Sequence, residues 1–287
     1  MRDFNETTAT AAVLERMSGA EDARFRQVMT SVVTHLHAVI REVEPTPEEW
    51  MTAIRFLTRT GQKCDDKRQE FILLSDTLGV SMLVDAINHR KPSGATESTV
   101  LGPFHVAGAP RKAMGDTISL DGQGEPAFVS GLVLDEAGRP IAGAELDVWQ
   151  TSSDGHYDIQ DPNQPAMNLR GLFTTGPDGR YWFRTVKPSS YPIPTDGPVG
   201  DLLLAMGRHP MRPAHIHFIV GAPGFEAVTT HIFVAGDPYL DSDAVFGVKD
   251  SLVEPFERRD DPGEARKIGL PNPFYFASHD FVLVRSR

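Results

Sequence analysis

The chain has 287 residues, of which 40% are hydrophobic, and it carries a formal net charge of -11. This length suits one large domain or a domain with an appendage, and the acidic balance argues against nucleic acid or an anionic membrane as a partner. The single cysteine, Cys64, excludes an intrachain disulfide and a cysteine-based metal site. The N-terminal residues lack the basic start and apolar core of a signal peptide, and no apolar run approaches the roughly 20 residues that span a bilayer. We therefore expect a cytoplasmic protein in a reducing compartment.

The first ninety or so residues have the pattern of helices. Apolar residues recur at spacings of three and four from Phe25 to Val43, which predicts an amphipathic helix with one apolar stripe. In Thr46-Pro47-Glu48-Glu49 the threonine suits an N-cap, the proline suits the first helical position, and the last glutamate completes a capping box. We expect this second helix to end near Gly61 and a third to run from near Asp66 to His89.

The character of the sequence changes after a turn-rich break at residues 91–97. Glycine and proline become frequent, and the predicted strands are 128–134, 144–150, 171–175, 180–186, 213–220, 227–234 and 281–284. Pro177-Asp178-Gly179 predicts a hairpin between the third and fourth of these strands, and the fifth and sixth are expected to pair. Several short strands with regular turns favour a mainly antiparallel β-sandwich. The predicted fold class is thus α+β, with a helical domain at residues 1–97 and a β-sandwich domain at residues 98–287.

One predicted strand carries two histidines in the segment Arg212-Pro213-Ala214-His215-Ile216-His217. Alternate side chains of a strand face the same way, so His215 and His217 should project from one face about 7 Å apart. A single histidine on such a strand is typically a hydrogen-bonded core residue. Two on one face each need a polar partner, and a metal ion is one partner that serves both.

Two tyrosines offer further ligands. Tyr157 follows a predicted strand, and Tyr191 lies in a loop before the histidine strand; loops at the end of a rigid sandwich often carry sites. Each tyrosine taken singly is an ordinary packing residue, and spacing alone does not establish a metal. If a metal is bound, two imidazoles and two phenolates without a thiolate favour Fe(III) over Zn(II) or copper, whereas magnesium or calcium would want carboxylates.

Four segments taken together resemble the intradiol ring-cleaving dioxygenase family, and within it the members that act on hydroxyquinol. The segments are Glu97–Phe104, with its Gly-Pro-Phe ending, Asp154–Tyr157, Tyr191–Pro194 and Arg212–His217. The turn at 135–140 leading into Val-Trp-Gln also fits. The resemblance covers nearly the whole chain, and the combination of segments is specific although each alone is not.

The resemblance implies a catalytic centre and a reaction. Tyr157, Tyr191, His215 and His217 match the four ligands of one non-haem Fe(III) per subunit. Tyr191 also matches the ligand that leaves the iron and accepts a substrate proton, and Arg212 matches the arginine that stabilises charge on the ring carbon being oxygenated. The expected activity is cleavage of hydroxyquinol (1,2,4-trihydroxybenzene) by O2 to 3-hydroxy-cis,cis-muconate or maleylacetate in aromatic catabolism. Without the neighbouring motif, Arg212 would be read as a structural or surface ion-pair residue.

The resemblance also implies a substrate pocket that draws on the helical region. Asp76 is expected to read the additional hydroxyl of hydroxyquinol, since a site built to hydrogen-bond a hydroxyl rejects an analogue that lacks it. The alternative for Asp76 is an exposed helix carboxylate. The expected pocket residues are Leu73, Asp76, Val100, Gly102, Pro103, Phe104, Ile193, Pro194 and Val245.

One residue departs from the family pattern. His231 stands where glutamine is expected in relatives that cleave catechol. The departure argues against catechol as the primary substrate and leaves the expected iron ligation untouched. Two interpretations stay open: His231 is a hydrogen-bond partner near the iron, or it is a change on the pocket side without consequence.

The same sequence leaves other functions open and also bears on the partners. Catechol or chlorocatechol is the alternative substrate, and a non-catalytic transthyretin-like binding module is the alternative of another class, because Gly131–Pro140 has a turn pattern that such domains share. A hydrolase is less favoured because the chain has no G-x-S-x-G motif of the nucleophile-elbow kind. Family members dimerise through the helical domain with a lipid-binding tunnel at the interface, so a homodimer with bound lipid is also expected.

Overall fold

The computed structural model describes residues 3–65 and 68–286. The chain divides into two compact units, Met1–Arg59 and Thr60–Arg287. The domain boundary that the sequence suggests at residue 97 stays a prediction. Among the described residues, no helix is long and apolar enough to cross a membrane.

The first unit is helical, as predicted. It contains α1 (Ala9–Arg16), α2 (Ala23–Val43) and most of α3 (Pro47–Gln62). The predicted capping box is confirmed, because the backbone N–H of Thr46 donates to Oε2 of Glu49 at 2.8 Å and the Glu49 N–H donates to Thr46 Oγ1 at 3.3 Å. These bonds satisfy backbone donors that the first turn of a helix leaves unpaired.

The helix expected from near Asp66 to His89 is instead two helices, α4 (Glu70–Thr77) and α5 (Val80–Asn88). Gly79 separates them with φ +72°, a left-handed conformation that glycine adopts without a steric penalty. The prediction of one continuous helix was therefore wrong, and its expected start near Asp66 lies outside the described residues.

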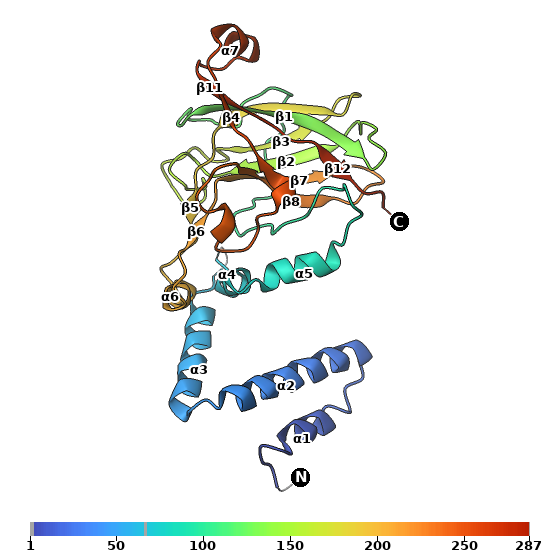
Figure 1. The fold of residues 1–287 in the computed structure, drawn as a ribbon, viewed down its shortest axis with the longest axis vertical. Helices are drawn as coiled ribbons and strands as arrows, with labels where there is room; N and C mark the ends of the chain where they lie inside the picture. The colour runs from blue at the N-terminus through green and yellow to red at the C-terminus, as the bar shows by residue number, and fades with distance from the viewer. Residues whose placement is uncertain (1–2, 66–67, 287) are drawn as a thin grey trace. The chain divides into compact units, whose positions relative to one another are not determined.

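Two five-stranded sheets and a two-stranded ribbon form the rest of the second unit (Figure 1). One sheet contains the path β10-β11-β1-β12, with β4 also paired antiparallel to β1, and the second has the order β3-β2-β7-β8-β9. The strands are β1 (Pro126–Asp135), β2 (Glu145–Gln150), β3 (Arg170–Thr174), β4 (Arg180–Val186), β5 (Tyr191–Pro192), β6 (Met211–Arg212), β7 (His215–Gly221), β8 (Val228–Val234), β9 (Val253–Glu254), β10 (Glu257–Arg259), β11 (Phe274–Ser278) and β12 (Phe281–Leu283). The helices α6 (Pro198–Ala205) and α7 (Pro262–Ile268) and the 3-10 turns Leu240–Ser242 and Asp250–Leu252 lie between strands. The α+β class and the mainly antiparallel pairing are confirmed.

The expected hairpin between β3 and β4 does not form. The strand β3 pairs with β2, whereas β4 pairs with β1 in the other sheet. The reason is packing: Phe173 of β3 and Phe183 of β4 stack across the core with ring centroids 5.2 Å apart. With β3 and β4 in different sheets, both rings are buried between the two sheets. A hairpin within one sheet would not place the rings across the core from each other. The expected antiparallel pair of β7 and β8 is confirmed.

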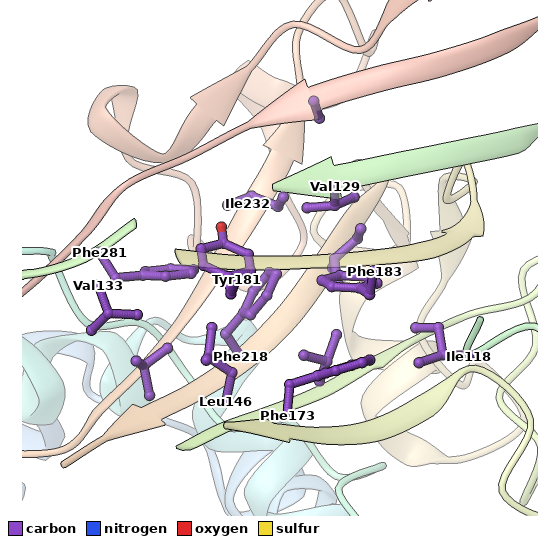
Figure 2. Close-up of a cluster of buried hydrophobic side chains, with 14 of the residues drawn as sticks. Ile118, Val129, Val133, Leu146, Phe173, Tyr181, Phe183, Phe218, Ile232 and Phe281 are labelled. Carbon is purple, nitrogen blue, oxygen red and sulfur yellow. The ribbon is translucent and has the colours of Figure 1, made fainter. Parts of the chain in front are cut away.

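The core lies between the two five-stranded sheets (Figure 2). Val129 and Val133 of β1 face Leu146 of β2 and Phe218 of β7, and all four side chains are completely buried. Burying apolar surface is the main favourable term in folding. A packed sandwich of this kind gives a rigid platform for the side chains at its end.

Candidate metal centre

The two histidines of the H-x-H segment lie on β7, the middle strand of its sheet. His215 and His217 are 2% and 1% exposed. In the register, His217 is flanked by Trp149 on β2 and by His231 on β8. The Trp149 ring stacks on the His217 imidazole with centroids 4.6 Å apart and an interplanar angle of 13°. The His217 imidazole is therefore held in a packed position, and both imidazoles are buried.

The structure brings the two predicted tyrosines to these histidines. Tyr157 lies beyond the end of β2, and Tyr191 lies on β5, where it pairs with Arg212 on β6. The Tyr157 hydroxyl is 2.9 Å from His217 Nε2 and 3.2 Å from the Tyr191 hydroxyl, and His217 Nε2 is 3.1 Å from His215 Nε2.

These distances fit a single metal ion. Ligand atoms about 2.0–2.1 Å from one ion and at right angles to each other lie about 3 Å apart. The two phenol oxygens and two imidazole nitrogens form a continuous chain of such separations. The donor set, with two hard oxygens, two imidazoles and no thiolate, suits a strongly Lewis-acidic ion. The residues present therefore fit the metal that the sequence predicts.

The state of His215 also suits a ligand. Its Nδ1 lies 2.7 Å from the carbonyl oxygen of Pro213, which can only accept, so Nδ1 carries the proton and Nε2 presents a lone pair to the other donors. Burial, followed by the nearby Arg212 charge, lowers the pKa of His215 to about 3. Burial also lowers the pKa of His217 well below its ordinary value. Both imidazoles are thus neutral near pH 7, the form that binds metals.

The pKa of the Tyr157 phenol shifts in the opposite direction from the pKa values of the two histidines. Burial raises its pKa well above the ordinary value of 10, and the adjacent Tyr191 adds to the increase. A phenolate at this position accordingly needs a compensating positive charge, which a bound cation supplies.

Arg212 brings a fixed positive charge to the site. Its Nη1 is 3.4 Å from His215 Nε2, and Asp243 binds the other side of the guanidinium through Nε at 3.1 Å and Nη2 at 3.3 Å. Burial is the largest single influence and would lower the pKa of Arg212, but the charge and hydrogen bond of Asp243 together with the nearby Tyr191 and Tyr157 outweigh it, so the net shift is upward. Asp243, which the sequence analysis did not identify, directly follows the 3-10 turn Leu240–Ser242 in the segment between β8 and β9.

The predicted pocket residues include a cluster of apolar side chains and one buried carboxylate, that of Asp76. Leu73, Val100, Ile193 and Val245 belong to one buried apolar cluster. Asp76 is 4% exposed, so the alternative of an exposed helix carboxylate is wrong. Burial raises the pKa of Asp76, and a hydrogen bond with Ser81 opposes that shift.

A cavity of about 650 Å³ lies against this region. Its lining includes the predicted residues Asp76, Val100, Gly102 and Pro103, and it also includes Thr99, which the sequence analysis did not single out. Pro194 is half-buried, whereas Pro103 is exposed. The cavity therefore combines two buried carboxylates, Asp76 and Asp85, with other polar groups and apolar surface.

Gly102 and Phe104 connect the cavity wall to the metal-centre residues. Gly102 has φ +74°, and a Cβ atom there would lie 3.2 Å from Cε1 of His217. The ring of Phe104 stacks on Tyr157 with centroids 4.6 Å apart. The segment from Thr99 to Phe104 thus packs directly on two of the four predicted ligands.

A third imidazole lies in the same cluster. His215, His217 and His231 each offer a ring nitrogen within 4.8 Å of the others, and among the described residues they form a group that could hold a metal ion. His231 is completely buried, and its Nδ1 is in contact with Thr99 Oγ1.

Comparison with known proteins identifies the family. The profile described as "Dioxygenase" matches residues 100–284, and the profile described as "Catechol dioxygenase N terminus" matches residues 22–96. A hydroxyquinol 1,2-dioxygenase from Rhizobium sp. (strain MTP-10005) is 58% identical over 284 residues, which is 98% of this chain and 96% of that protein. The chain belongs to the intradiol ring-cleavage dioxygenase family.

Other members are similar over almost the whole chain. The 6-chlorohydroxyquinol 1,2-dioxygenase of Cupriavidus pinatubonensis (strain JMP 134 / LMG 1197) is 53% identical over 91% of this chain and 95% of its own. The solved structure of hydroxyquinol 1,2-dioxygenase from Pseudomonas putida DLL-E4 has a TM-score of 0.92 and 51% identity, covering 98% of this chain and 99% of that one. This intradiol dioxygenase is therefore an enzyme, and the alternatives of a binding module and a hydrolase are not favoured.

Proposed function

We propose that this dioxygenase cleaves hydroxyquinol between its two adjacent hydroxylated carbons, with O2 as the second substrate. The observation that carries the proposal is the convergence of two phenols and two imidazoles beside a cavity with a buried carboxylate. The names of the Rhizobium and Pseudomonas putida relatives support the substrate. Both oxygen atoms of O2 enter the product, a six-carbon hydroxymuconate that is a tautomer of maleylacetate.

The proposed cofactor is one Fe(III) per chain, held by Tyr157, Tyr191, His215 and His217. Bound Fe(III) would supply Lewis acidity and electron-accepting character toward a chelated aromatic diol. The neutral state of the buried imidazoles and the Pro213 carbonyl behind His215 support this assignment, because both leave nitrogen lone pairs directed at the other donors.

The protein's own groups would handle the protons and charges of the reaction. Tyr191, as a phenolate, would accept one proton of the incoming diol. Arg212, kept charged by Asp243, would stabilise negative charge that develops on the substrate ring. Because the guanidinium is almost completely buried, its field is weakly screened by water.

Asp76 is the proposed recognition group for the third hydroxyl. Its carboxyl is buried in the wall of the cavity, on the same helix as the apolar Leu73. Without a substrate hydroxyl to bind, this buried polar group would be left partly unpaired, which costs about 1–3 kcal/mol. The proposed pocket is completed by Val100, Gly102, Pro103, Phe104, Ile193, Pro194 and Val245.

The proposed assembly is a cytoplasmic homodimer formed through the helical domain at residues 1–97, with lipid bound at the interface. Support comes from the apolar stripe of α2, on which Phe25, Val32, Leu36 and Val43 are exposed in the single chain. Sedimentation at micromolar concentration tests the proposal, and a clean monomer would refute it.

Oxygen uptake measured with hydroxyquinol and catechol side by side tests the proposed substrate. We expect one O2 consumed per hydroxyquinol and a clearly higher kcat/KM for hydroxyquinol than for catechol. Equal or reversed specificity constants would support the alternative, a catechol or chlorocatechol dioxygenase.

A further inference from the structure

The two histidines of β7 differ in how their second ring nitrogen is held. Nδ1 of His215 lies 2.7 Å from the Pro213 carbonyl. Nδ1 of His217 is buried and has no hydrogen-bond partner among the described residues. A histidine that binds a metal almost always donates its other ring N–H to a partner, which fixes the tautomer and the ring orientation. His217 therefore lacks a partner that the proposed iron site requires.

His231 has the complementary deficiency. Its Nε2 is also buried without a partner among the described residues, while its Nδ1 contacts Thr99 Oγ1. It is the direct cross-strand neighbour of His217, with ring centroids only 4.0 Å apart and an interplanar angle of 53°. Two unpartnered, buried nitrogens thus belong to adjacent, inclined rings, and an unmade hydrogen bond at a buried polar atom is costly.

Trp149 is not an alternative partner for Nδ1 of His217. The indole N–H of Trp149 is itself buried without an acceptor among the residues described. An indole nitrogen is a donor only, so it cannot accept a proton from His217. Its ring also stacks nearly parallel to the imidazole at 13°, and an N–H in the plane of a stacked ring does not point at its neighbour.

We propose that His231 and Thr99 form a relay that positions His217 and connects it to the substrate cavity. In the structure the two unpartnered nitrogens belong to neighbouring rings but are not hydrogen-bonded to each other. In the relay, a rotation of the rings lets Nδ1–H of His217 donate to Nε2 of His231, while Nδ1–H of His231 donates to Oγ1 of Thr99. Every donor then has an acceptor, and Nε2 of His217 keeps its lone pair for the metal. The hydroxyl proton of Thr99, a residue on the cavity wall, remains free to bind an occupant of the cavity. The proposal rests on the iron site proposed above.

The relay requires different hydrogen-bonding groups at positions 231 and 99. At position 231, glutamine can accept from His217 through its amide oxygen and donate to Thr99 through its amide nitrogen, whereas leucine can do neither. At position 99, serine keeps the hydroxyl and valine removes it with little change of shape. His279 supplies a matched control, because it is also a buried imidazole with an unpartnered Nε2, but its Nδ1 is held by Glu254 at 2.6 Å instead of facing the metal-centre residues.

The test is iron retention by the purified holoenzyme during equilibration with increasing concentrations of a chelator. We expect His231→Leu and Thr99→Val to lose iron at about 10- to 100-fold lower chelator concentration than the unchanged protein. His231→Gln, Thr99→Ser and His279→Leu should stay close to the unchanged protein. Thermal unfolding of each variant separates iron loss from general destabilisation, and Thr99→Val keeps the test decisive if His231→Leu does not fold.

A spectroscopic measurement supplies a second readout. An imidazole that donates a hydrogen bond is a more basic ligand. Removing the acceptor of that hydrogen bond therefore makes the imidazole a weaker donor to the iron, and the iron becomes a stronger electron acceptor. The phenolate-to-iron absorption band should move to longer wavelength in His231→Leu and Thr99→Val and not in His279→Leu. Unchanged iron retention and an unchanged band in both relay variants would overturn the relay. If the protein without substitutions holds no iron, the proposed iron site is overturned, and the relay with it.

Discussion

The carboxylate of Asp243 lies 3.1 Å from Nε of Arg212, and both side chains are almost completely buried beside His215. The pair crosses a long stretch of sequence, from β6 to the loop after β8. A buried guanidinium without a counter-ion is costly, so Asp243 is what allows Arg212 to remain charged next to two imidazoles.

Replacing Asp243 should therefore damage both stability and activity. Asp243→Asn leaves the Arg212 charge buried and unpaired, and breaking a buried ion pair in this way costs about 3–5 kcal/mol. Urea unfolding measures the loss. The control is Asp196→Asn, which breaks the exposed contacts of Asp196 with Lys63 and Arg68 and should cost less than about 1 kcal/mol. Equal costs for the two variants would contradict the assigned role of Asp243.

The proposed ligands should separate iron binding from catalysis. His217→Ala removes a ligand nitrogen and should lose activity together with bound iron. Tyr191→Phe removes only a hydroxyl and should lose activity while the remaining three donors retain part of the iron. Iron content and oxygen uptake, measured on the same preparations, check both. Full activity in either variant would be incompatible with the proposed site.

The buried carboxylate of Asp76 should decide substrate preference. Asp76→Ala removes the group that we expect to bind the third hydroxyl, so the ratio of kcat/KM for hydroxyquinol to that for catechol should fall by about 10-fold or more, as expected for one lost hydrogen bond of 1.4 kcal/mol or more. The measurement is oxygen uptake with each substrate. A ratio that is the same before and after the substitution would defeat the role of Asp76.

The carboxylate of Asp135, at the end of β1, should contribute to the acid sensitivity of the fold. A side-chain hydrogen bond from Arg139 and further bonds from the backbone lower the pKa of Asp135 to about 2. Since the unfolded pKa is about 3.9, this stabilisation is complete above about pH 4 and is lost as the pH falls toward 2. The difference in unfolding free energy between the unchanged protein and Asp135→Asn should be largest at pH 5 and shrink by pH 2. A difference that does not vary with pH would rule out this contribution.

Local patterns predicted much of the fold. The capping box at Thr46 and Glu49 was predictable because both partners lie within one helical turn. The pairing of β3 and β4 was not, because adjacent strands joined by a short turn can pair side by side or face each other across a core. The stacked rings of Phe173 and Phe183 stabilise the second arrangement. Because this stabilisation depends on packing with the rest of the sandwich, the local sequence does not reveal it.

At the proposed metal centre, too, local sequence patterns predict only part of the arrangement. The alternation of His215 and His217 indicates one face of a strand, but their meeting with Tyr157 and Tyr191 was expected only from the family resemblance. Asp243 carries no local signal, because its pairing with Arg212 depends on how a loop folds back over the sheet. Thr99 likewise acquires a possible role only from its contact with a strand far along the chain.

The most direct test of the iron centre is the visible absorption and iron content of the unchanged protein purified from iron-replete cells. Phenolate bound to Fe(III) absorbs visible light by charge transfer, so the proposed ligation by Tyr157 and Tyr191 predicts a reddish protein with one iron per chain. A colourless, iron-free preparation that is correctly folded would contradict the account.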